Sequence, residues 1–255
     1  MKSKARSTDE LPFRSLAFDD SYQRSVLPAY VAKLVGKWDL KKVGVITVSI
    51  RNRKPYVIDG QHRVRAALEL GLSDTKIRCE VYRGLSVEEE AQLFLALNDA
   101  KSVTAIDRYQ AGLVANDPTC IGVRDTLAQY GLAVGNTGGD GYVRCANTLL
   151  KIYERDPAAL EDTCLLLTGA WGTRSEALDH VVVTGMGMVV NRFNGEIDRG
   201  VFVKKLAKYH GGPGALVGDA RGLAALKPFG VTRASAELMV DTYNKGRRSG
   251  QLAPL

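Results

Sequence analysis

The spacing of apolar residues divides the chain near residue 102 into a mixed first part and a helical second part. In the first part, runs that are β-branched or that alternate between apolar and polar predict strands over 43–50, 55–59 and 76–82. Helical spacing predicts helices over 22–35 with an interruption near Pro28, over 61–70, and over 86–97. The last of these helices begins with Ser86 and Glu89, the two ends of a capping box.

The second part is almost wholly helical in pattern. Helices are predicted over 104–115, 119–130, 142–154, 176–191, 199–209 and 232–246. The Gly-rich runs at 135–141 and 211–214 are predicted to be loops. The predicted fold class is therefore α+β, with a small mixed-sheet domain over 1–101 and a mostly helical domain over 102–255.

Composition places the chain among globular proteins. It has 255 residues, of which 45% are hydrophobic and 25% charged, and its mean hydropathy is −0.11. Because no run approaches the ~20 apolar residues of a membrane helix, and the first ten residues have no apolar core, we expect neither a membrane span nor a secretion signal. The four cysteines are far apart, so neither a zinc site nor a disulfide framework is indicated and a cytoplasmic location is expected.

The basic excess is concentrated at one end. The formal net charge is +7, and residues 199–255 hold ten Lys or Arg against three Asp or Glu. A polyanion-binding surface and a solubilising helical face both explain this asymmetry.

The sharpest chemical signal is the run Asp59-Gly60-Gln61-His62-Arg63, between a predicted strand and a predicted helix. The first turn of a helix offers N–H groups and a partial positive charge to an anion. Gly60 permits close backbone approach, Arg63 presents a fork of donors to phosphate, His62 can donate or shuttle a proton, and Asp59 can hold a metal or orient a nucleophile. The alternative is a structural corner, in which Asp59 caps the helix and Arg63 pairs with a surface acid.

Two further segments offer compatible side chains. Gln23 and Arg24, in the polar run 20–24, are within the reach expected of the same pocket. Asn98 is an oxygen ligand of the kind that a hard metal prefers, and Lys101 is a point charge suited to phosphate. Asn98 is also a favoured residue at the C-terminal cap of a helix.

Together, residues 20–24, 59–66 and 98–101 resemble the ParB/sulfiredoxin superfamily, in particular its DGQHR-type branch of phage, plasmid and DNA-modification loci. The run DGQHRVRAA is similar to the GERRxRA box of ParB proteins and the GCHRxxA box of sulfiredoxins, which hold the triphosphate of CTP and of ATP respectively. The resemblance implies a bound nucleoside triphosphate, with phosphate contacts from Gly60, Gln61, His62 and Arg63. Its second box, NDAK, implies that Asn98 helps to hold Mg²⁺ and that Lys101 contacts phosphate.

The chain departs from these relatives at three positions. Gln61 stands where sulfiredoxins have their nucleophilic cysteine, which excludes reduction of sulfinic acids. Leu97 stands where ParB proteins usually have Glu, which weakens the predicted metal site. Lys101 replaces an Arg and loses its bidentate geometry, so specificity for CTP is not assumed.

DNA contacts are predicted in the helical part. The helix at 142–154 would present Arg144, Asn147, Lys151 and Arg155 to one side, and arginine and asparagine are side chains that read base edges. The alternative is a packing helix with a solvated face. The cluster Lys245, Arg247 and Arg248 suits phosphate backbones, although a helix dipole alone also favours cations at that place.

Three functions follow from these patterns. The first is a nucleotide-binding ParB-like protein that acts on or with DNA, with a homodimer compatible with it. The second is a Mg²⁺-dependent enzyme of the same fold, namely an NTPase, nuclease or phosphotransferase, with Asp59 and His62 as its catalytic residues. The third is an inactive descendant in which the corner only stabilises the fold.

Overall fold

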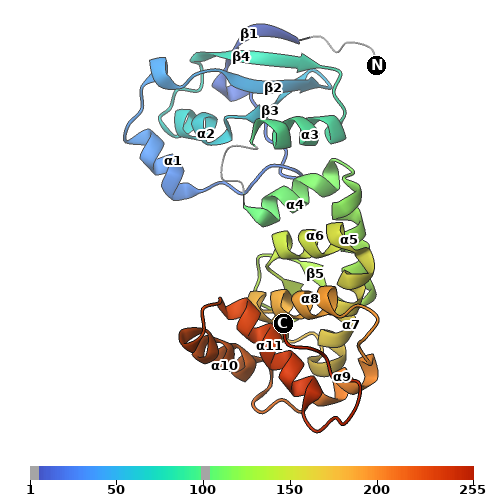
Figure 1. The fold of residues 1–255 in the computed structure, drawn as a ribbon. Coiled ribbons are helices and arrows are strands. Elements are labelled where there is room, and N and C mark those ends of the chain that lie inside the picture. Colours follow the sequence, from blue (N-terminus) through green and yellow to red (C-terminus); the bar gives the residue numbers. More distant parts are fainter. Residues whose placement is uncertain (1–5, 99–103) are drawn as a thin grey trace. The chain divides into compact units, whose positions relative to one another are not determined.

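The chain folds into two compact units. The computed structural model describes residues 6–98 and 104–255, and the units span Met1–Asp117 and Pro118–Leu255. The boundary predicted near residue 102 falls among residues outside the description, and the compact units divide later along the chain. The reason is that the helix after residue 104 packs against the one before residue 98, so it belongs to the first unit. The α+β class is confirmed (Figure 1).

The first unit is built on a four-stranded mixed sheet in the order β1-β4-β2-β3. Its strands are β1 (Arg6–Pro12), β2 (Ile46–Arg51), β3 (Lys54–Asp59) and β4 (Lys76–Arg83). β4 pairs antiparallel with β1 and parallel with β2, and β2 pairs antiparallel with β3. Three strands were predicted. β1 was missed because it is a polar, exposed edge strand without the apolar alternation that the prediction relied on.

A two-residue turn joins β2 to β3. Its residues, Asn52 and Arg53, both have positive φ, at 52° and 62°. Such turns match the right-handed twist of a β-hairpin. The last residue of β3, Asp59, is separated by Gly60 alone from the helix that begins at Gln61.

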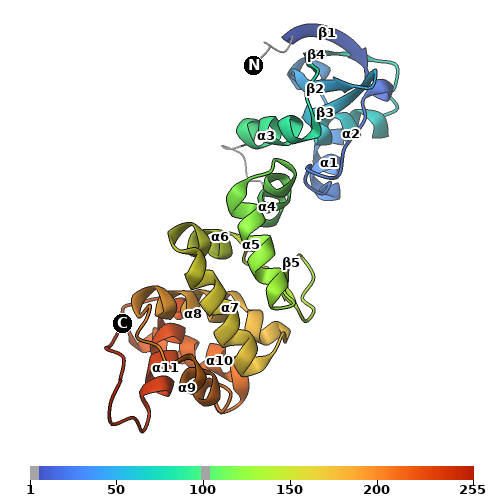
Figure 2. The same ribbon diagram turned by 90° about the vertical axis from the view of Figure 1, so that its right-hand side faces the viewer.

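The helices of the first unit are α1 (Pro28–Val35), α2 (Gln61–Glu69), α3 (Val87–Leu97) and α4 (Ala105–Val114). Pro28 begins α1 and does not interrupt a longer helix, since the first turn of a helix needs no N–H at that position. The capping box of Ser86 and Glu89 is confirmed. The helices α2 and α3 lie against one face of the sheet (Figure 2), where Val64 and Ala67 of α2 join the core with Val48 and Val81 of the sheet.

The second unit is helical. Its helices are α5 (Pro118–Gln129), α6 (Ala146–Arg155), α7 (Pro157–Trp171), α8 (His180–Arg192), α9 (Arg199–Leu206), α10 (Gly212–Leu226) and α11 (Val231–Asn244), with the short helix η3 (Ser175–Leu178) before α8. Two short parallel strands, β5 (Ala133–Val134) and β6 (Tyr142–Val143), lie between α5 and α6. The connection between α5 and α6 therefore carries its own strand pairing.

The second unit differs from the prediction in two places. The helix α7 was not predicted. The run at 211–214 is not a loop, because Gly211 takes the left-handed conformation as N-cap and Pro213 lies in the first turn of α10.

The four cysteines are free. Burial raises the pKa of the Cys145 and Cys164 thiols to about 12, so neither is a ready nucleophile. Within residues 6–98 and 104–255, no helix has the length and apolar character needed to span a bilayer.

Candidate functional site

A small pocket lies where β3 meets α2. Its volume is about 120 Å³, and its walls come from the segment before α1, the end of β3, the first turn of α2 and the end of α3. It brings together these predicted site residues: Gln23, Arg24, Asp59, Gly60, Gln61, His62, Arg63 and Asn98. Lys101 lies outside the described residues. Sequence positions that are 75 residues apart, from Gln23 to Asn98, therefore meet in one place.

The corner at Gly60 depends on the absence of a side chain. Gly60 is the N-cap of α2 with φ 106°, and α2 has no side-chain cap. A Cβ at this position would lie 2.6 Å from Cδ1 of Ile46 and 2.9 Å from a guanidinium nitrogen of Arg63. The first turn of α2 therefore begins against the sheet, with its N-terminal residues lining the pocket.

Arg63 is bonded to the protein on three sides. One guanidinium nitrogen donates to the carbonyl oxygens of Val43, at 2.7 Å, and Val45, at 3.1 Å. The other donates to Asp59 Oδ2 at 2.9 Å, an ion pair between the first turn of α2 and the last residue of β3. This side chain therefore fixes the segment before β2 to the corner, as in the structural alternative, and its contact with phosphate stays a prediction. Its partner is Asp59 of the same corner, in place of a separate surface acid.

His62 is buried and neutral. Its Nε2 accepts a hydrogen bond from the backbone N–H of Leu27 at 3.0 Å, so the ring proton lies on Nδ1, and Nδ1 faces Arg24 at 3.4 Å. Burial, and then the charge on Arg24, lowers the pKa of His62 below its usual 6.5. The edge of this ring also contacts Tyr30, with ring centroids 5.4 Å apart. His62 therefore offers the pocket a donor and no free basic nitrogen.

Three amide side chains line the same pocket. Gln61 is 7% exposed, and its Nε2 has no hydrogen-bond partner among the residues that the structure describes. Gln23 donates to the carbonyl oxygen of Val57, and its buried Oε1 has no partner within the described part of the chain. Asn98 donates to the carbonyl oxygen of Phe94 at 2.8 Å. Asn98 is thus the C-cap of α3, as the structural alternative proposed, while it also lines the pocket.

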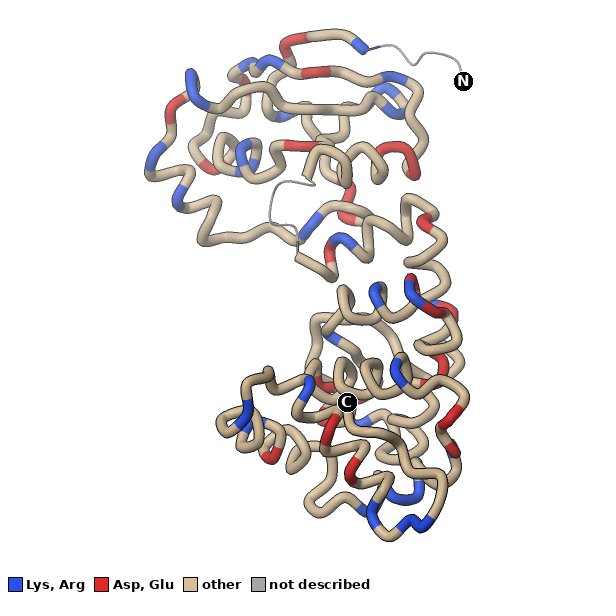
Figure 3. Tube along the Cα trace, viewed as in Figure 1, with Lys and Arg blue, Asp and Glu red and all other residues tan. Residues whose placement is uncertain are grey.

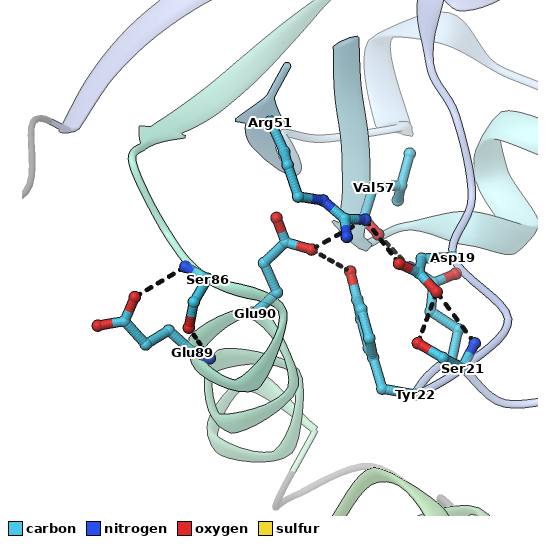
Figure 4. A network of polar contacts seen from close by, with 9 residues as sticks. Asp19, Ser21, Tyr22, Arg51, Val57, Ser86, Glu89 and Glu90 are labelled. Atoms are coloured by element: carbon cyan, nitrogen blue, oxygen red, sulfur yellow. Dashed lines mark hydrogen bonds and ion pairs between the residues drawn. The ribbon is translucent and has the colours of Figure 1, made fainter. Parts of the chain in front are cut away.

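A buried carboxylate supports the pocket from behind. Glu90 of α3 is fully buried, and its Oε2 accepts from the Tyr22 hydroxyl at 3.1 Å and lies 3.6 Å from Arg51 (Figure 4). Arg51 also pairs with Asp19 at 2.6 Å. The network therefore ties the segment that carries Gln23 and Arg24 to the sheet and to α3.

Sequence reasoning missed Glu90. Burial raises the pKa of this carboxyl, and the nearby charge of Arg51 opposes the rise. A signal was present, because Glu90 falls on the same helical face as the buried Phe94, where the spacing calls for an apolar residue.

The predicted DNA-contact residues lie in the second unit. Arg144 precedes α6, while Asn147, Lys151 and Arg155 are exposed at four-residue spacing along it. Lys245 and Arg248 are exposed after α11. Arg247 is engaged, since it lies over the Tyr243 ring at 4.4 Å and donates to the carbonyl oxygen of Gly250. The basic and acidic residues of both units are marked along the chain in Figure 3.

Comparison with known proteins gives a family. The sequence profile described as "Family of unknown function (DUF6551)" matches residues 18–218, which include the whole pocket and α5 to α9. The chain belongs to the DUF6551 family. No curated protein matches this DUF6551 chain.

Among solved structures, the DUF6551 chain is similar to a ParB protein and to two structures of a ParB N-domain. The chromosome-partitioning protein ParB from Caulobacter crescentus, complexed with CTP-gamma-S, is 13% identical, with a TM-score of 0.33 over 67% of this chain and 97% of that chain. Two structures of a pNOB8-like ParB N-domain are 11% and 12% identical, with TM-scores of 0.43 and 0.41. They cover 89% and 92% of this chain, and 99% and 96% of those chains. At TM-scores below 0.5, these similarities do not assign a function to the chain.

The corner predicts a difference between two glycine substitutions. Gly60→Ala should destabilise the protein more than Gly71→Ala, although both residues have positive φ. A Cβ at Gly71 would meet nothing within 4 Å, so only a backbone cost of about 1–2 kcal/mol is expected there. At Gly60 the close approach to Ile46 and Arg63 adds about 1–3 kcal/mol. Urea unfolding of both variants measures the difference, and equal losses of stability would contradict the described packing.

The neutral state of His62 predicts a pH dependence of stability. Because the lowered pKa means that the unfolded chain binds a proton at His62 more readily, its contribution is present above about pH 6.5 and is lost as the pH falls below that value. His62→Gln keeps an acceptor for the Leu27 N–H and removes the titration. Unfolding free energies between pH 7.5 and 5 should therefore fall less steeply in His62→Gln than in the wild type, and parallel profiles would refute the assignment.

Proposed function

We propose that the pocket at the start of α2 binds the phosphate groups of a nucleotide. The observation that carries the proposal is Gln61, whose amide donor is buried without a partner in the described structure beside an uncapped helix N-terminus. Leaving such a donor unpaired costs about 1–3 kcal/mol, which a bound anion would offset. The resemblance of DGQHRVRAA to known phosphate-binding boxes supports the same conclusion.

Apart from Asp59, which pairs with Arg63, the polar groups around the pocket suit an anion. Arg24 and the Nδ1–H of His62 face each other at its wall. The partial positive charge of the α2 N-terminus adds to them. The cavity of about 120 Å³ has room for phosphate groups, whereas pockets for whole ligands are about 300–1,000 Å³. A sugar and base would therefore lie at the rim, where Tyr30 is 45% exposed.

Binding is favoured over catalysis. The two candidate catalytic groups both bond to the protein, since Asp59 Oδ2 accepts from Arg63 and His62 Nε2 accepts from Leu27. No cluster of three or more potential metal-ligating His, Cys, Asp or Glu residues occurs in the described chain. Mg²⁺ would have Asn98 and the unpaired Oε1 of Gln23 as protein donors and would need phosphate oxygens to complete its shell.

Replacing Gln61 tests the proposal. Gln61→Leu removes the donor and keeps a similar volume, so the free energy of unfolding should stay unchanged or rise, because no hydrogen bond is removed. Affinity for the ligand should fall about tenfold, as expected for a hydrogen bond to a charged group. Titration calorimetry with ATP, CTP, GTP, UTP and tripolyphosphate, each with Mg²⁺ and with EDTA, measures the affinity.

The exposed Gln129→Leu on α5 is the matched control. Lower stability of Gln61→Leu with unchanged ligand affinity would make Gln61 a structural residue. The absence of binding by every phosphate compound to the wild type would overturn the proposed function.

DNA binding is a second candidate function. The observation that favours it is a cavity of about 460 Å³ in the second unit, where Lys205, Lys208, His210 and Lys245 come together with a single acid, Asp219. Lys205 is used internally, because it donates to the carbonyl oxygens of Tyr243 and Lys245 at the end of α11. Lys208, Lys245 and Arg248 are exposed to solvent.

Salt dependence tests this second function. Lys245→Gln with Arg248→Gln should lower affinity for duplex DNA and reduce the slope of log affinity against log salt by about 0.9 for each phosphate that the variant no longer neutralises. Tripolyphosphate binding at the first unit should not change. A fluorescence-anisotropy titration between 50 and 200 mM salt measures the slope, and a wild-type protein that binds no duplex at 50 mM salt would refute DNA binding.

A further inference from the structure

Two glycines of α8 bring three helices together. A Cβ on Gly187 would lie 2.4 Å from Cδ1 of Ile152 on α6, and a Cβ on Gly185 would lie 2.8 Å from Oγ of Ser235 on α11. Both glycines are buried. The helices α6 and α11 therefore approach α8 more closely than any larger residue at these positions would allow.

These close approaches gather three arginines around one cavity. Arg155 follows Ile152 by one turn of α6, Arg233 precedes Ser235 on α11, and Arg192 ends α8. All three line a cavity of about 380 Å³, together with Asn191 and Met188. Leu255 also lines it and accepts from Arg233 through its backbone oxygen, and the described lining includes no Asp or Glu.

Two of the three guanidinium groups are uncommitted. Arg155 and Arg192 make no hydrogen bond or ion pair with any described residue, and the one ring contact of Arg192 is with Phe193, at 5.7 Å. Arg233 donates to Leu255 and to Glu237. The acid next to Arg155 in sequence, Asp156, instead caps α7 and accepts from Asn194.

The helix dipole does not account for the whole arrangement. Cations in the last turns of α6 and α8 are favoured there, which explains Arg155 and Arg192 singly. Arg233 lies in the first turn of α11, where the dipole disfavours a cation. Its ion pair with Glu237 and its bond to the backbone oxygen of Leu255 hold it there, beside two arginines that have no such partner among the described residues.

We propose that the cavity lined by Arg155, Arg192 and Arg233 binds a phosphate of a DNA backbone. The exposed residues Asn147, Lys151 and Arg155 form a row that leads from the cavity along α6, with steps of about 6 Å at four-residue spacing. Planar guanidinium groups bind phosphate oxygens in pairs. A row of donors that ends in an arginine cluster suits a chain of phosphates better than a single small anion.

The inference rests on the proposed DNA binding but names a different surface from Lys245 and Arg248. Arg155→Gln with Arg192→Gln is the test variant, and its folding is checked by its melting temperature. This should fall only slightly, because the variant loses the favourable helix-dipole interactions and the ring contact of Arg192 but no hydrogen bond or ion pair. The charge-matched control is Arg221→Gln with Lys227→Gln, since both residues are exposed and line none of the cavities described above.

Anisotropy titrations with a 20-base-pair duplex give the readout. The test variant should lose about tenfold in affinity for each arginine, and its salt slope should decrease by about 0.9 or more. The control should lose less than about threefold. Equal losses of affinity in the two variants would overturn the inference, and if Lys245→Gln with Arg248→Gln then still weakened binding, the proposed DNA function would stand without this site.

Inorganic phosphate and tripolyphosphate test whether the cavity binds a small phosphate compound instead of a DNA backbone. Thermal stabilisation by these anions that disappears in the Arg155→Gln, Arg192→Gln variant, without any binding of duplex DNA, would assign the cavity to a small phosphate compound and overturn the DNA source. Duplex binding by the wild type that is sensitive to the test variant would support the proposal.

Discussion

The ion pair of Arg63 with Asp59 is the interaction on which the first unit depends most. Through the same guanidinium, Arg63 also holds the carbonyl oxygens of Val43 and Val45, so the end of β3, the start of α2 and the approach to β2 are fixed together. Gly60 makes this geometry accessible, since any side chain there would occupy the space of Arg63 and Ile46. The pocket therefore depends on the corner in which Arg63 lies, whether or not Arg63 itself contacts a ligand.

Support for the pocket comes from a second layer. Tyr22, Glu90 and Arg51 join the polar segment before α1 to α3 and to the end of β2, and this segment carries Gln23 and Arg24. Burying the carboxylate of Glu90, one oxygen of which has no partner among the described residues, costs free energy. The network nevertheless connects three elements at a fixed distance and orientation, which apolar packing alone specifies less strictly. A site with several polar groups needs that accuracy.

Local rules predicted well where the determinants are local. The capping box at Ser86 and the helix start after Gly60 follow from neighbouring residues, and both are confirmed. The prediction failed where a distant partner decides, as for β1, which is a strand because β4 offers it an edge. At Arg63 the residue type indicated a fork of donors, but its carbonyl partners lie about twenty residues earlier and only the fold brings them near. Glu90 broke the apolar pattern of its helix, and such a break indicates a polar network without naming its members.

The two glycines of α8 also limit how this family can vary. They are two residues apart and therefore face nearly opposite directions on the helix, about 200° around its axis. An insertion or deletion between them would turn one contact out of its interface, so α8 can change in composition but not in length at this point. If Gly187 were replaced by a larger residue, a smaller side chain would be needed at position 152 of α6. If Gly185 were replaced, the chain around Ser235 of α11 would have to shift. Sequence changes in α8 should therefore be accompanied by changes in α6 and α11, and homologous sequences should show them as coupled substitutions.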